Sequence, residues 1–97
     1  MKYNLRVIIT CKKDISKVLS EFPPPEGWEM SSAKTTYDLS YAFEALDDPA
    51  ARMHVKKDLE KMYSLCVEMS SWKCLKEEWT IREILTREGS QENILRR

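Results

Sequence analysis

The sequence predicts a small α+β domain, and three observations lead to that class. The chain has 97 residues, of which 42% are hydrophobic, so it can supply one modest core and no second one. Its first residues alternate between apolar and polar, as a strand does, whereas its second half repeats apolar residues at helical spacing. We expect a single domain over residues 1–97.

The N-terminal segment predicts a strand followed by a short helix. The strand pattern consists of apolar residues at every second position, namely Tyr3, Leu5, Val7, Ile9 and Cys11. Asp14 can cap a helix whose apolar stripe recurs at i, i+3, i+4 and i+7, namely Ile15, Val18, Leu19 and Phe22. Three consecutive prolines then end this helix.

The segment 22–28 is the most unusual stretch of the chain and is expected to connect two elements. Pro23, Pro24 and Pro25 fix their φ angles and favour an extended, stiff backbone. Their Xaa-Pro bonds make the segment a candidate substrate for a peptidyl-prolyl isomerase. Beyond it, residues 28–47 predict a strand followed either by a second strand, forming a hairpin, or by an irregular turn and short helix.

A long helix is predicted from about residue 49 to residue 71. Asp48 can accept the free backbone amides at its start, and Pro49 is tolerated at the first helical position. The helix carries a 4-3-4-3 apolar stripe, namely Val55, Leu59, Met62, Cys66 and Met69.

A short helix is predicted near the C-terminus. Thr80 and Glu83 have the spacing of a capping box, and Ile81, Ile84 and Leu85 supply its apolar residues. Gly89 is expected to stop it. The tail 90–97 either docks through its two apolar residues or frays.

Composition restricts the function classes. The 16 basic and 16 acidic residues cancel, so direct DNA contact is not expected. The charges are segregated, however: residues 23–48 hold Lys34 against six acids, which is either a solvated face or a mimic of a phosphate backbone. Without a secretory signal or an apolar stretch long enough for a membrane, we expect a cytoplasmic protein with its three cysteines reduced.

Catalytic chemistry is not expected. The single histidine, His54, lies on a highly charged helical segment and is interpreted as a surface residue. Cys66 and Cys74 are too isolated from further ligands to predict a metal site, and two glycines cannot build a phosphate loop. We therefore predict a non-enzymatic protein without cofactor or metal.

Protein binding remains, and the aromatic residues indicate where. Phe22, the three prolines and Trp28 form the candidate partner-binding segment, because exposed Pro beside Trp can dock on another protein. The alternative is that Trp28 begins a strand. Trp72 and Trp79 are secondary interface candidates and also candidates for the core.

The opening sequence, MKYNLRVIITCKKDISKVLSEFPPPEGWEM, resembles the lambdoid-phage anti-RecBCD proteins, and the resemblance extends over the full chain. It implies a non-enzymatic protein that binds the host RecBCD helicase-nuclease at its RecC subunit, favours phage recombination and protects phage DNA ends. It also implies that a host peptidyl-prolyl isomerase joins the complex, which would meet Pro23, Pro24 and Pro25. The alternative function is a small nucleic-acid-binding or DNA-mimicking regulator.

Overall fold

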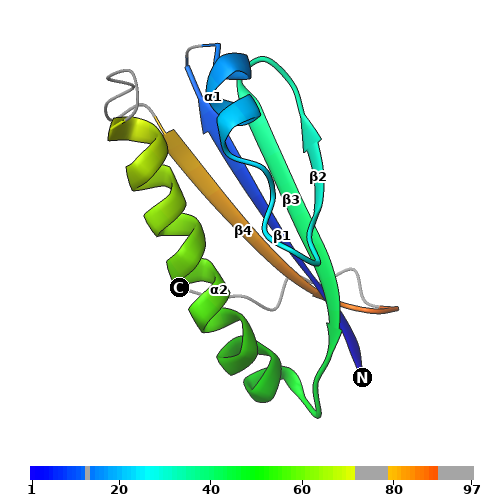
Figure 1. Ribbon diagram of the computed structural model, residues 1–97. Helices are drawn as coiled ribbons and strands as arrows, with labels where there is room; N and C mark the ends of the chain where they lie inside the picture. The colour runs from blue at the N-terminus through cyan, green and yellow to red at the C-terminus, as the bar shows by residue number, and fades with distance from the viewer. Residues whose placement is uncertain (13, 72–78, 90–97) are drawn as a thin grey trace.

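The computed structural model describes residues 1–12, 14–71 and 79–89, and within them four antiparallel strands form one sheet with a long helix on one face (Figure 1). This architecture confirms the predicted single α+β domain. The elements are, in chain order, β1 (Lys2–Cys11), α1 (Ser16–Glu21), β2 (Glu29–Ser32), β3 (Thr36–Glu44), α2 (Asp48–Ser71) and β4 (Trp79–Arg87).

The strand order in the sheet is β2-β3-β1-β4, so β1 is a central strand. It pairs antiparallel with β3 on one side, where Leu5 lies opposite Tyr41, and with β4 on the other, where Leu5 lies opposite Leu85. The four-residue strand β2 continues the sheet beyond β3. The sequence left two alternatives for residues 28–47, and the structure shows two paired strands there.

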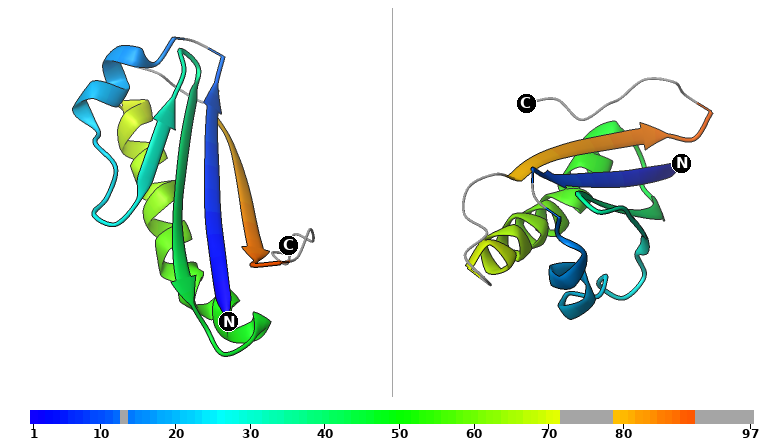
Figure 2. Two further views of the ribbon diagram at one scale, coloured as in Figure 1. Left: turned by 90° about the vertical axis from the view of Figure 1, so that its right-hand side faces the viewer. Right: turned by 90° about the horizontal axis from the view of Figure 1, so that it is seen from above.

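The core lies between the sheet and α2. The odd-numbered residues of β1 are all buried, because successive side chains of a strand point to opposite faces and this face meets the helix. Val55, Met62 and Cys66 of α2 are buried opposite them, as the helical stripe predicted. Viewed from above, α1 and α2 lie on the same side of the sheet, and the opposite face carries no helix of the described chain (Figure 2).

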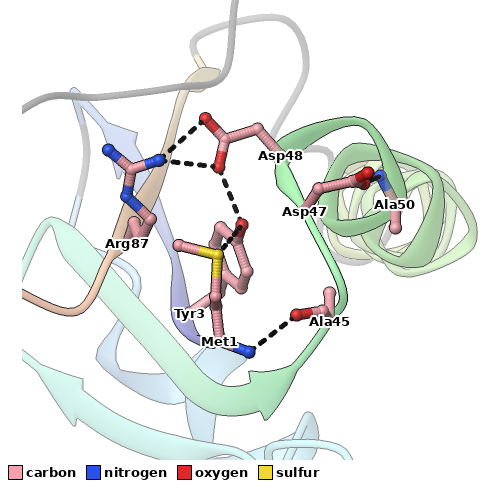
Figure 3. Close-up of polar contacts among 7 residues, drawn as sticks. All are labelled: Met1, Tyr3, Ala45, Asp47, Asp48, Ala50 and Arg87. Atoms are coloured by element: carbon pink, nitrogen blue, oxygen red, sulfur yellow. Dashed lines mark hydrogen bonds and ion pairs between the residues drawn. The ribbon is translucent and has the colours of Figure 1, made fainter.

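The start of α2 is held by two aspartates with different partners (Figure 3). Asp47 accepts a hydrogen bond from the Ala50 amide at 2.9 Å, so the prediction that Asp48 caps the helix was wrong. Asp48 instead accepts the Tyr3 hydroxyl at 2.7 Å and lies 3.3 Å from the Arg87 guanidinium. It turns toward the sheet because a buried tyrosine and a cation are available there.

The predicted C-terminal helix was wrong, because residues 79–87 form strand β4. Thr80 and Glu83 do not cap a helix. They lie on opposite faces of the strand, and Glu83 accepts a hydrogen bond from the Tyr63 hydroxyl at 2.5 Å. The sheet decides this segment, since β1 has a second edge that requires a hydrogen-bonding partner. Trp72, Cys74 and the tail 90–97 lie outside the described residues.

None of the helices in the described ranges combines the length and apolar character needed to cross a membrane.

Candidate protein-interaction site

The proline segment runs between α1 and β2 on the side of the sheet that carries α2 (Figure 2). Its first residue is fixed to the sheet, because the hydroxyl of the fully buried Tyr37 donates a hydrogen bond to the Phe22 carbonyl at 2.9 Å. The Phe22 side chain packs partly buried against the core. The residue that precedes the prolines is therefore attached to β3.

A tight turn closes the other end of the segment. The Trp28 amide donates to the Pro25 carbonyl at 3.2 Å, and Gly27, the third residue of this turn, has φ = 89°. A positive φ at that position is typical of a type II turn and favours glycine. The turn reverses the chain so that β2 begins directly after Trp28.

Trp28 connects the segment to the helix through the sheet. Its ring contacts Tyr41, with the ring centroids 4.4 Å apart, and the Tyr41 hydroxyl donates a hydrogen bond to the Asp58 carboxylate on α2. Burial and the neighbouring carboxylate both raise the pKa of Tyr41. Trp28 is half-buried, so it both precedes a strand and keeps part of its surface open.

Pro23 and Pro25 form one wall of a groove whose other wall is α2. The groove has a volume of about 660 Å³. Met62 and Leu65 supply its apolar helical lining, and it is rimmed by polar residues of α2, namely Lys57, Glu60, Lys61, Ser64 and Glu68. Such a groove can accept an apolar segment of another protein and pair charges at its rim.

The groove residues on α2 were not predicted as site residues. The sequence placed Met62 on the core stripe and Lys57 and Lys61 on a solvated face. Only the tertiary structure brings this flank of the helix beside prolines that precede it by more than 30 positions. The spacing of Lys57, Lys61 and Leu65 at i, i+4 and i+8 indicates a shared flank, but not what lies beside it.

The remaining candidates lie elsewhere. His54 is exposed, as predicted, and stacks on Phe43 with the ring centroids 4.3 Å apart. Cys11 and Cys66 are both buried, and burial raises the pKa of the Cys66 thiol to about 11. Trp79 is half-buried against the core at the start of β4. Across the described ranges, no three His, Cys, Asp or Glu side chains cluster as a metal site would require.

Comparison with protein-family models, with curated proteins and with solved structures finds no match to this chain.

Proposed function

We propose that this chain is a non-enzymatic phage protein that binds the host RecBCD helicase-nuclease and alters its handling of phage DNA ends in favour of recombination. The proposal joins the resemblance of the opening sequence to the geometry of the segment 22–28. The observation that carries it is the groove between Pro23, Pro25 and α2, which offers an apolar floor with a charged rim. The protein acts in the bacterial cytosol, with RecC as the subunit it contacts.

The structure supports a preformed binding site. Both ends of the proline segment are tied down, by the Tyr37 hydroxyl at Phe22 and by the Tyr41 ring at Trp28. A segment held in this way loses little conformational freedom on association, which favours affinity. Between the two anchors Pro23 is exposed, so a partner can reach it.

The exposure of Pro23 supports a second contact, in which a host peptidyl-prolyl isomerase binds Pro23 together with the half-buried Pro24 and Pro25. An isomerase recognises an Xaa-Pro bond in an extended segment, and these prolines lie in backbone that belongs to no helix or strand. We expect added cyclophilin-type isomerase to shift the amide resonances of Gly27 and Trp28. Unchanged resonances at saturating isomerase would exclude this contact.

The DNA-mimicking alternative receives less support. Of the acids in residues 23–48, Asp38 pairs with Arg6 at 2.5 Å, Asp48 pairs with Arg87, and Asp47 caps α2. These three carboxylates are turned to internal partners, so only Glu26, Glu29 and Glu44 remain as exposed acids of this segment to offer a DNA mimic. Salt dependence separates the hypotheses, since an electrostatic mimic loses affinity steeply with ionic strength and an apolar groove does not.

Copurification tests the proposed function. Tagged protein added to bacterial lysate should retain RecBCD subunits and change the exonuclease activity of the complex. Replacing both groove prolines, Pro23→Ala with Pro25→Ala, should weaken binding at least about tenfold. Pro49→Ala is the matched control, because Pro49 is also exposed but lies at the start of α2.

The outcomes separate the partner from the site. If no RecBCD subunit is retained and nuclease activity is unchanged, the proposed function is wrong. If RecBCD binds the double variant and the wild type equally well, the function survives and the groove is not its site.

A further inference from the structure

The two edges of the sheet are unequal. β2 forms one edge and has four residues, whereas β4 forms the other and has nine. No proline, glycine or bulge interrupts β4, and its β-branched residues suit a strand. Within the described ranges, no strand pairs with the outer side of β4.

The register shows which backbone groups point outward. The Glu88 amide donates to the Lys2 carbonyl at 2.9 Å, so the even-numbered residues of β4 direct their hydrogen-bonding groups toward β1. The odd-numbered residues alternate with them. Glu83, Leu85 and Arg87 therefore point their amides and carbonyls to the outer edge.

We propose that the β4 edge is a homodimer interface, in which β4 pairs antiparallel with β4 of a second copy around a two-fold axis at Leu85. The two sheets become one continuous eight-stranded sheet. Pairing over residues 83–87 forms about six backbone hydrogen bonds, since each pair of outward-pointing residues exchanges two. A two-fold axis makes the interface self-complementary and closed.

Charge complementarity favours a second copy of this chain as the partner of β4, and it favours the register centred on Leu85. With the axis at Leu85, Arg82 lies opposite Glu88 of the other copy. This pairing occurs twice in the dimer, and opposite charges on directly paired residues stabilise a sheet. Moving the axis to Glu83 or to Arg87 places that charge opposite itself, which is unfavourable.

The helix beside this edge provides a second surface for the same copy. Tyr63 reaches β4 through its hydrogen bond to Glu83 and is 40% exposed. Val67 lies one turn further on the same flank of α2 and is 67% exposed. A two-fold axis perpendicular to the sheet keeps both helices on one side of it, so these apolar surfaces face one another across the dimer.

Sedimentation of the full chain over concentrations from about 1 μM to about 1 mM tests the proposal, with an expected dissociation constant on the order of 10 μM. Arg82→Glu and Glu88→Arg, each alone, create like-charge pairs and should weaken dimerisation about tenfold. The two changes together restore opposite charges and should recover the wild-type constant within about threefold. Val67→Asp should also weaken the dimer, whereas Met53→Asp, at a residue of α2 that is even more exposed, should not.

Hydrogen exchange supplies an independent measurement. The Glu83, Leu85 and Arg87 amides should become protected as concentration rises. A chain that stays monomeric throughout overturns the proposal, and so does a dimer that neither charge reversal affects. Protection of these amides in the monomer, independent of concentration, would show that the chain itself covers the edge, and this too would overturn it.

Discussion

Removing the Tyr41 hydroxyl should destabilise the contact between sheet and helix while leaving the aromatic packing intact. Tyr41→Phe deletes the donor to Asp58 but keeps the ring that contacts Trp28. A hydrogen bond to a charged group contributes about 1.5–3 kcal/mol when buried. Tyr41 and Asp58 are both half-buried, so we expect the lower limit, a loss of about 1.5 kcal/mol in the free energy of unfolding.

Tyr63→Phe is the matched control, because it breaks the same kind of link between α2 and the sheet at a more exposed place. Its expected cost is about 0.5 kcal/mol. Urea unfolding at neutral pH, followed by far-ultraviolet circular dichroism, measures both, and a loss of about 1.5 kcal/mol lowers the midpoint by about 1 M. A double-mutant cycle with Asp58→Asn isolates the pair. If Tyr41→Phe costs no more than Tyr63→Phe, burial does not strengthen this hydrogen bond and the reasoning fails.

Three further predictions concern the core, the turn and pH. Leu5 is fully buried in the central strand, so Leu5→Ala should lower the free energy of unfolding in urea by about 2–5 kcal/mol. Asn4→Ala, at the exposed neighbouring position, should lower it by under about 0.5 kcal/mol, and equal losses would contradict the assigned faces. Gly27→Ala meets no atom within 4 Å, so only its positive φ opposes it; we expect a loss of about 1 kcal/mol and altered Trp28 fluorescence, and an unchanged spectrum with unchanged stability would refute the turn. The folded pKa of Cys66 is raised to about 11 from 9.0, so its contribution to stability is complete below pH 9 and is lost between pH 9 and 11. Cys66→Ala should flatten that decline in alkaline unfolding curves, and a slope equal to that of the wild type would contradict it.

Local sequence patterns predicted secondary structure and burial correctly where each residue strongly prefers one conformation. The alternation in residues 3–11 predicted which side chains of β1 are buried, because a strand covered on one face permits little else. The long helix begins at Asp48, one residue from the prediction, since Pro49 is tolerated only in its first turn. The exact cap was wrong, because Tyr3 and Arg87 compete for Asp48 from distant parts of the chain.

The sequence predicted only one side of the candidate groove. The proline segment was identified by its composition, but the side formed by α2 was not, since Lys61 and Leu65 look like ordinary residues of an amphipathic helix. Trp28 was open to two interpretations, and the structure places it directly before β2 with its ring on Tyr41.

The sequence by itself thus determined the α+β class, the buried face of the first strand and the long helix. Each of these follows from local sterics or from periodicity, which neighbouring residues establish without distant partners. The tertiary structure alone decided that Trp79–Arg87 is a strand, that prolines and helix enclose a groove, and that β4 presents an outer edge. Ile81 and Leu85 fit either period, whereas Ile84 fits only the helical one, so the sequence favoured a helix and the free edge of β1 instead paired this segment as a strand.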